Sequence, residues 1–204
     1  MAGYGLDPVR NADGGTVRAN NFSDGNGYRI AATAPTAYFE GDLCTLSAGL
    51  LVTDMAGASP GPVIGVFYGA EYAEYVDNSS GDVKFVRSIA NGTVAKEKYK
   101  AYVYDDPYCL FKIQGDQVAT AIDATKVGHN VQIVAGPSGS ATTHKSGLVA
   151  DSSTAATGNA GFPLTILGSA EAPDGAYTAV GTTMDVLVKI NTHQFGIAAG
   201  NAGV

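Results

Sequence analysis

Short apolar runs separated by turn-forming residues constrain the fold of this chain most, and residues 39–72 show the pattern most clearly. This segment reads FEGDLCTLSAGLLVTDMAGASPGPVIGVFYGAEY. Leu43–Leu46 and Gly49–Val52 flank a Ser-Ala-Gly turn, and a long polar loop then leads to the apolar run Val63–Tyr68. Short apolar runs bounded by Gly, Pro, Ser and Asp are typical of strands. The segment therefore predicts strand, turn, strand, loop and strand, with Gly65 at a bulge or a close backbone approach.

Apolar runs separated by turn-forming residues continue along the chain. Lys100–Tyr104 and Leu110–Gln114 both alternate between apolar and polar residues, and Asp105-Asp106-Pro107 separates them. This arrangement predicts a hairpin with one buried face. Residues 116–126 are the one helical candidate, with Asp116 as its cap. We therefore predict a mainly all-β fold, a small β-barrel or β-sandwich with one short helix.

Two segments stand apart from this pattern. Residues 1–24 are rich in Gly, Asn and Asp and lack periodicity, which predicts an extended N-terminal arm that orders only against a partner. Residues 25–204 then form the β-barrel or β-sandwich domain. Within that domain, residues 135–161 are rich in Gly, Ser and Thr and predict a long surface loop inserted between strands.

Composition and charge argue against several classes of protein. The formal net charge is −7, which is unfavourable for binding a phosphate backbone, so no direct contact with nucleic acid is expected. The first residues have neither a basic region nor an apolar core of a secretory signal. No apolar run approaches the roughly 18 residues that a membrane-spanning helix needs. We therefore expect a protein that is made and folded in a cytoplasm and has no membrane partner.

The residues that often carry chemistry are not arranged for it in the sequence. Cys44 and Cys109 lie in apolar runs without the helix-start context that activates a thiol, and the sequence leaves open whether they are bonded to each other. Three histidines, at positions 129, 144 and 193, lack metal-ligand spacing. The adjacent carboxylates of Asp105 and Asp106 fit a turn better than a calcium site. We expect no catalytic residue, no cofactor and no metal, and hence no enzyme.

Apolar and aromatic side chains are the better candidates for a functional role, as interface residues. Tyr68 and Tyr72 follow the central apolar run, and with Tyr75 and two glutamates they form an aromatic and acidic patch. The N-terminal arm offers scattered anchors. The residues predicted to contact a capsid or another subunit are Tyr4, Leu6, Val9, Phe22, Tyr68, Tyr72 and Tyr75.

Several strings of residues resemble the capsid decoration, or cement, proteins of tailed bacteriophages. They are residues 38–43 (YFEGDL) leading into 49–52 (GLLV), 63–69 (VIGVFYG), 103–107 (VYDDP) and 188–195 (VKINTHQF). The resemblance implies a virion structural protein without enzymatic activity, assembled in the host cytoplasm onto the outer surface of the phage head. It also implies that the major capsid protein is the partner, that the chain is a homotrimer, and that it stabilises contacts between capsomers.

Two alternatives stay open from the sequence. The first is a phage tail or fibre component, and the second is a carbohydrate-binding β-module in which tyrosines hold a glycan. Neither the strand order nor the symmetry axis follows from the residues.

Overall fold

The regular secondary structure of the described residues is almost entirely β-strand. In a computed structural model, the described residues are 3–19, 28–30, 37–53, 62–73, 83–90, 99–116, 118, 120–135, 139–156, 158–170 and 184–196. The strands are β1 (Asp7–Asn11), β2 (Tyr28–Arg29), β3 (Tyr38–Phe39), β4 (Leu43–Ser47), β5 (Leu50–Thr53), β6 (Val63–Ala73), β7 (Val83–Val86), β8 (Ser88–Ile89), β9 (Tyr99–Tyr104), β10 (Cys109–Gly115), β11 (Asn130–Val131), β12 (Ile133–Ala135), β13 (Leu148–Ala150), β14 (Leu164–Ser169) and β15 (Met184–Ile190). Two single-turn 3-10 helices are η2 (Ala124–Lys126) and η3 (Ser152–Thr154). The prediction of an all-β fold is confirmed.

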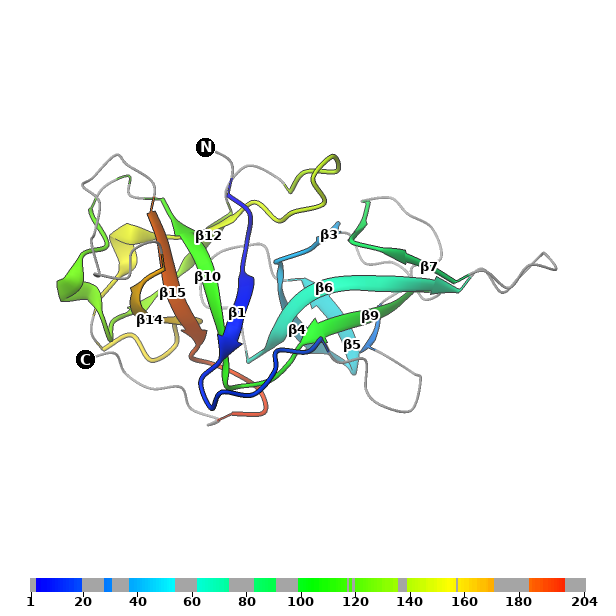
Figure 1. The fold of residues 1–204 in the computed structure, drawn as a ribbon, viewed down its shortest axis with the longest axis horizontal. Helices are drawn as coiled ribbons and strands as arrows, with labels where there is room; N and C mark the ends of the chain where they lie inside the picture. The colour runs from blue at the N-terminus through cyan, green and yellow to red at the C-terminus, as the bar shows by residue number, and fades with distance from the viewer. Residues whose placement is uncertain are drawn as a thin grey trace.

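The strands form two main sheets that occupy the two halves of the molecule (Figure 1). Sheet A has the order β11-β14-β15-β10-β13-β12, and β1 also pairs with β10. Sheet B has the order β2-β9-β6-β4-β5, and β7 also pairs with β6. A third, two-stranded sheet joins β3 to β8.

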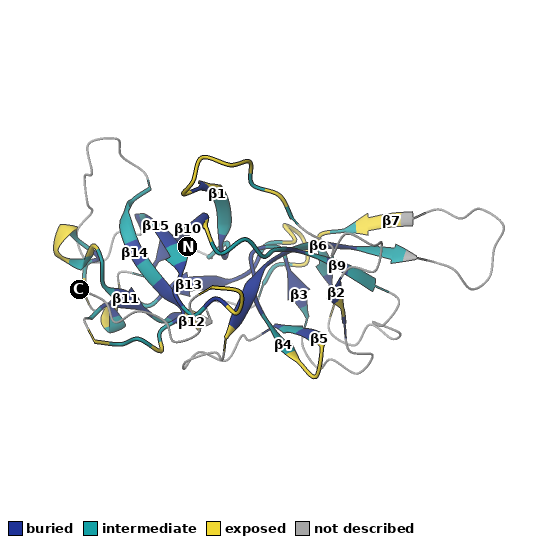
Figure 2. Ribbon diagram, turned by 90° about the horizontal axis from the view of Figure 1, so that it is seen from below, coloured by how far each residue is buried: buried dark blue, intermediate teal, exposed yellow. Residues whose placement is uncertain are grey.

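Each half of the molecule has its own apolar cluster, and β6 contributes residues to both clusters. Phe111 lies in the first cluster, under sheet A, and Phe67 in the second, under sheet B; both are fully buried. Leu43, Val63 and Val66 belong to sheet B but pack into the first cluster, so the start of β6 joins the halves. Figure 2 shows this burial along β10, β13 and the first part of β6.

The three strands and the turn predicted for the segment 39–72 are confirmed, whereas the predicted loop at residues 54–61 lies outside the described residues. β4 and β5 pair as an antiparallel hairpin around Ala48 and Gly49, both of which have a positive φ. β6 lies on the other side of β4, with a register irregularity beside Gly65. Gly65 has a φ of 155°, and a Cβ there would meet the carbonyl group of Tyr104. The expectation of a bulge or a close backbone approach at this glycine is confirmed.

The predicted hairpin of residues 100–104 and 110–114 is wrong, because its two strands belong to different sheets. β9 pairs with β6 and β2 in sheet B, whereas β10 pairs with β15 and β1 in sheet A. The connecting turn is held by other segments: Tyr28 Oη donates to Asp105 Oδ2 at 2.6 Å, and Asn11 Nδ2 donates to Asp106 Oδ2 at 2.9 Å. Alternation predicts one buried face, but it does not identify the neighbouring strand.

The N-terminal residues are part of the fold, which corrects the prediction of an arm that orders only against a partner. β1 pairs with β10, and Leu6 is 1% exposed within the first apolar cluster. The backbone nitrogens of Gly5 and Leu6 donate to the carbonyls of Leu148 and Gly41. The sequence did not indicate this strand, because its apolar residues are irregularly spaced and its partner, β10, lies about 100 residues further along the chain. Residues 20–24 lie outside the described part of the chain.

The segment 135–161 is not one surface loop, because it contains β13 and η3. Leu148, Val149 and Ala150 are all buried, and β13 lies between β10 and β12 in sheet A. The small residues around it made this segment resemble a loop, although a short strand buried on both faces needs only a few apolar residues.

The predicted helix of residues 116–126 is also wrong, apart from the single turn η2. Asp123 caps this turn by accepting from Thr125 N, whereas Asp116 accepts from Ser152 N at 2.9 Å. Val118 is 76% exposed and Ile122 is fully buried, so these two residues, four apart, do not share the buried face of a helix. Asp116 therefore fixes η3 and the end of β13 instead of starting a helix.

Candidate functional site: an aromatic stripe and a charged junction

Four aromatic rings lie in contact on one face of sheet B and form what we call the aromatic stripe. Its members are Tyr68 on β6, Phe85 on β7, and Tyr102 and Tyr104 on β9. Ring centroids are 5.3 Å apart for Tyr68 and Phe85, 5.4 Å for Tyr68 and Tyr104, and 5.8 Å for Phe85 and Tyr102. Phe85 is 44% exposed. The stripe therefore offers solvent a set of rings that already hold one another in position.

Two features of β6 create the stripe. The register against β9 shifts between Phe67 and Gly69, so Tyr68 is an extra residue in the strand. Such a bulge redirects the side chains on either side of it. Gly69 then leaves space for Phe85, because a Cβ at this position would meet the Phe85 ring.

The bulge separates two of the predicted interface residues. Tyr72 pairs with Tyr99 across β6 and β9, with ring centroids 4.7 Å apart, and Tyr99 packs against the second apolar cluster. Glu71, the neighbour of Tyr72, faces the stripe instead and accepts from Tyr102 Oη. Tyr68 and Tyr72 thus lie on opposite faces of the sheet and do not form one patch. Tyr75 lies outside the described residues.

The predicted N-terminal contacts also divide. Leu6 is a core residue, and Phe22 lies outside the described chain. Val9 is 49% exposed, and the Tyr4 ring, which is half-buried, has Lys112 Nζ 5.2 Å from its centroid. Of these N-terminal candidates, Val9 is exposed, whereas Tyr4 is only partly exposed and its hydroxyl oxygen is buried.

A hollow of about 750 Å³ lies between β1 and the end of the aromatic stripe. Tyr104 is the last ring of the stripe. It also lines this hollow, together with Asp7, Arg10, Glu40 and Lys112. Burial raises the pKa of Tyr104 to about 12, so its phenol stays protonated and can donate a hydrogen bond. The stripe and the hollow form one continuous surface across both sheets.

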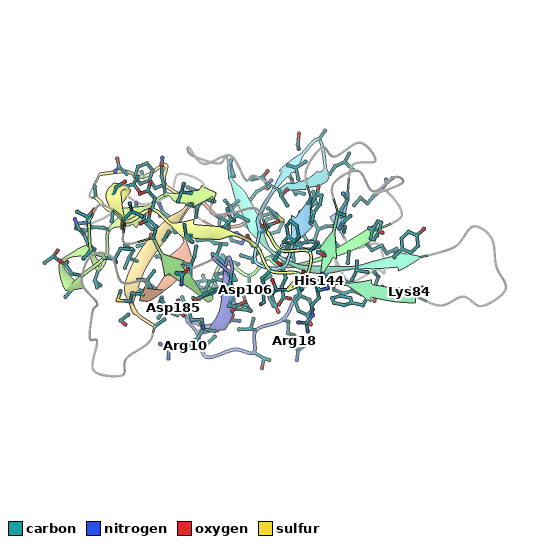
Figure 3. The ribbon with its side chains drawn as sticks, turned by 90° about the horizontal axis from the view of Figure 1, so that it is seen from above. Arg10, Arg18, Lys84, Asp106, His144 and Asp185 are labelled. Atoms are coloured by element: carbon teal, nitrogen blue, oxygen red, sulfur yellow. The ribbon has the colours of Figure 1, made fainter. Side chains whose placement is uncertain are left out.

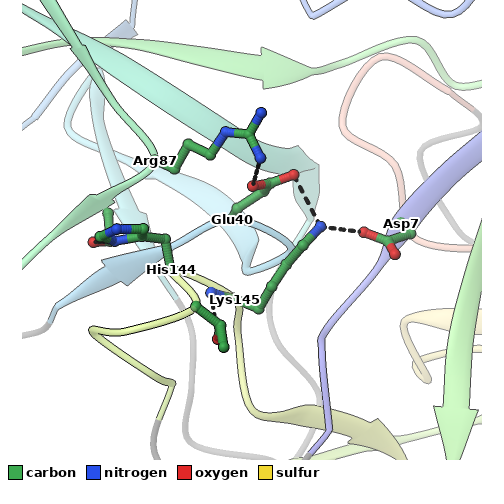
Figure 4. A network of polar contacts seen from close by, with 7 residues as sticks. Asp7, Glu40, Arg87, His144 and Lys145 are labelled. Carbon is green, nitrogen blue, oxygen red and sulfur yellow. Dashed lines mark hydrogen bonds and ion pairs between the residues drawn. The ribbon is translucent and has the colours of Figure 1, made fainter.

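A charged junction behind this hollow ties the sheets together (Figure 4). Lys145 Nζ lies 2.7 Å from Asp7 Oδ1 and 2.9 Å from Glu40 Oε1, and Arg87 Nη1 lies 3.5 Å from Glu40 Oε2. Burial would lower the pKa of Lys145, but the hydrogen bonds to both carboxylates outweigh it and raise the pKa. Since Asp7 belongs to sheet A and Glu40 follows β3, one ammonium group bridges two parts of the fold.

Lys145→Met is expected to lower the free energy of unfolding by about 1 kcal/mol, because Asp7 and Glu40 then face each other without the cation and the site is only partly shielded from solvent. Urea denaturation at low ionic strength measures the change. Lys84→Met is the matched control, since Lys84 is exposed on β7. Equal stabilities of the two variants would contradict a structural role for the junction.

The candidate catalytic groups are not brought together. Burial raises the pKa of Cys44 well above the usual range and that of Cys109 to about 12, and both thiols donate to backbone carbonyls. They are free cysteines, which answers the open question of a disulfide. His144 Nδ1 lies 2.8 Å from Ser88 Oγ on the exposed surface, and His193 is buried, which lowers its pKa.

Two further observations concern the described residues only. Within these ranges, no group of three or more His, Cys, Asp or Glu side chains is placed to hold a metal ion. No helix among them has the length and apolar character needed to cross a membrane.

Sequence reasoning missed most of the stripe. Tyr102 and Tyr104 are two residues apart in an alternating run, and this spacing was a usable signal that both rings share a face. Phe85 carried no such signal, because its place depends on the pairing of β7 with β6 and on Gly69. The junction was also missed, since Lys145 and Asp7 are 138 residues apart.

The chain is thus an all-β protein with an aromatic surface beside a charged junction. Comparisons with known proteins add no relative to this picture: no family model, no curated protein and no solved structure matches the chain.

Proposed function

We propose that the chain is a capsid decoration protein of a tailed bacteriophage, which binds the outer surface of the phage head through the aromatic stripe. The observation that carries the proposal is the stripe itself. Four rings in mutual contact present an apolar surface that needs little ordering on binding, and Tyr, Phe and other aromatic residues are enriched in protein interfaces. The strings that resemble phage cement proteins include Tyr68 and Tyr104, two members of the stripe.

The partner in this proposal is the major capsid protein, and the role is to hold neighbouring capsomers together. Tyr102 and Glu71 give the stripe a polar edge that is already hydrogen-bonded, as expected at the rim of a binding surface. Assembly as a homotrimer in the host cytoplasm would place three stripes on one particle surface. Such multivalency would strengthen a weak single contact through its effective concentration.

Phe85→Ser is expected to weaken capsid binding by tenfold or more, because it removes the most exposed ring of a contact cluster. The measurement is cosedimentation of the purified chain with heads assembled from the major capsid protein of the same genome. Val118→Ser is the control, since Val118 is 76% exposed and lies in the β10–β11 connection, away from sheet B.

The proposal fails if the wild-type chain does not cosediment with heads, or if Phe85→Ser binds as the wild type does. A thermal melt of each variant separates a lost contact from a lost fold. Cryo-electron microscopy of the particles tests the location directly, because the proposal requires density for this chain on the outer surface.

A further inference from the structure

A second hollow, of about 420 Å³, lies where the β9–β10 connection meets the segment after β15. Two aromatic side chains at this hollow are unusually open to solvent: Tyr108 is 62% exposed and Phe195 is 51% exposed. Leu110 and Lys189 form part of its floor, on the outer face of sheet A. We call this the sheet A hollow. Pockets that bind small molecules combine such apolar walls with a few polar groups.

Lys189 lines the sheet A hollow, and Arg10, which lines the hollow beside β1, lies next to it on the same face of sheet A. Leu110 pairs with Arg10 on one side and with Lys189 on the other, so all three side chains share a face of the sheet. Two strand spacings place the Cα atoms of Arg10 and Lys189 roughly 10 Å apart. Within the described residues, the ion pairs of this sheet involve Lys112 with Asp185 and Lys145 with Asp7, and none involves Arg10 or Lys189. Both cations are therefore available to an anionic ligand.

Two carboxylates, of Asp105 and Asp106, lie beside the sheet A hollow, and neutral hydrogen-bond donors hold both of them in place. Asp106 accepts from Asn11 Nδ2 and from the backbone nitrogen of Tyr108, and Asp105 accepts from Tyr28 Oη. Figure 3 shows Asp106 and Arg10 beside β1. The hollow thus combines aromatic walls with two cations that form no ion pair with a described carboxylate, in a chain whose formal net charge is −7.

The neighbouring edge of sheet A is poorly suited to a peptide ligand. A peptide strand would have to pair with the edge of β1 that no described strand occupies, but Pro8 lacks an N–H group and Val9 is the extra residue at a register shift. Proline and bulges are features that prevent strand addition at sheet edges. This observation favours a ligand that binds through its rings and charges instead of its backbone.

We propose that the sheet A hollow binds an acidic polysaccharide, whose sugar rings pack on Tyr108 and Phe195 and whose carboxylates pair with Arg10 and Lys189. One face of a pyranose ring consists largely of C–H groups, which pack well against an aromatic ring. A carboxylate gains a charge-assisted hydrogen bond from a guanidinium or ammonium group. The site does not include the aromatic stripe and does not depend on the capsid proposal.

The test is affinity electrophoresis of the full chain in gels that contain polygalacturonate, alginate, neutral dextran or polyglutamate. We expect retardation by at least one of the two polyuronates and none by dextran. Tyr108→Ala is expected to weaken binding by about tenfold, and Tyr108→Phe to preserve it, because the ring is kept. Lys189→Met is also expected to weaken binding by about tenfold, and Lys189→Arg to preserve it.

Each other outcome overturns the proposal. Absence of retardation by both polyuronates excludes the ligand class, and equal retardation by polyglutamate indicates simple binding of a polyanion or an acidic peptide. An unchanged affinity of Tyr108→Ala excludes ring stacking. Phe85→Ser is expected to bind the polyuronate normally and Tyr108→Ala to bind capsids normally, so failure of one proposal is distinguishable from failure of the other.

Discussion

Leu6→Ala is expected to lower the free energy of unfolding by about 3 kcal/mol, as is usual for a large-to-small change at a fully buried leucine. Leu6 is 1% exposed and packs in the first apolar cluster with residues of sheet A and the start of β6. Urea denaturation followed by circular dichroism measures the loss. Val9→Ala on the adjacent strand is the control, with an expected change within about 0.5 kcal/mol, because Val9 is 49% exposed.

Deletion of residues 1–11 extends the same test. It removes β1 from the edge of β10, Leu6 from the core and Asp7 from the charged junction, so its cost should exceed that of Leu6→Ala. If the N-terminal residues were instead an arm that orders only on a capsid, the truncated chain would melt at the wild-type temperature. It would lose its affinity for capsids but keep its stability. The two results separate a structural strand from a binding arm.

The strand content of this protein could be predicted from its sequence, because strand signals are local. The hairpin of β4 and β5, the position of β6 and the close approach at Gly65 all follow from apolar runs and glycines that lie within a few residues of one another. The pairing of β9 and β10 with different sheets could not be predicted in this way. The two strands would show the same alternation of apolar and polar residues whether they paired with each other or with other strands.

Short strands without periodicity were the second source of error. Leu148 and Val149 are only a brief apolar interruption among small polar residues, yet they form a buried strand between β10 and β12 in sheet A. β1 contains Pro8 and charged residues and is read as irregular. Both segments form strands because they pair with distant strands, and the intrinsic β-propensity of their residues is a weak guide to this outcome.

The interaction surface was predicted only in part for a related reason. The sequence places Tyr68 and Tyr72 four residues apart, a spacing that puts both on one face of a regular strand. The extra residue at Tyr68 reverses this relation, and it is visible only once β9 is seen beside β6. Tyr68 therefore belongs to the aromatic stripe, and Tyr72 belongs to the opposite face.

The turn before β4 provides the last prediction, which concerns pH. Asp42 is fully buried, and its backbone links the turn to β6, because Phe67 N donates to the Asp42 carbonyl at 2.9 Å. Burial raises the pKa of its carboxyl group to about 7, although hydrogen bonds from Ser146 and from Phe39 N favour the ionised form. The Asp42 Oδ1 atom is buried and has no hydrogen-bond partner among the described residues.

This shift destabilises the protein as the pH rises. The unfolded chain loses the Asp42 proton near pH 4, whereas the folded chain keeps it until about pH 7. Folding is therefore favoured by the protonated form, and the contribution of Asp42 is progressively lost between these two values. From pH 5 to pH 8 the loss amounts to about 3 kcal/mol, at roughly 1.4 kcal/mol for each pH unit up to the folded pKa.

Asp42→Asn removes this titration, so the stability of the variant relative to the wild type should improve by about 3 kcal/mol between pH 5 and pH 8. Urea denaturation of both proteins across this range gives the difference directly, and other titrating groups cancel in it. Asp13→Asn, which removes an exposed carboxyl group at a turn, is the matched control. Parallel curves for Asp42→Asn and the wild type would show that Asp42 is already ionised in the folded protein at pH 5, and that the turn accommodates the charge.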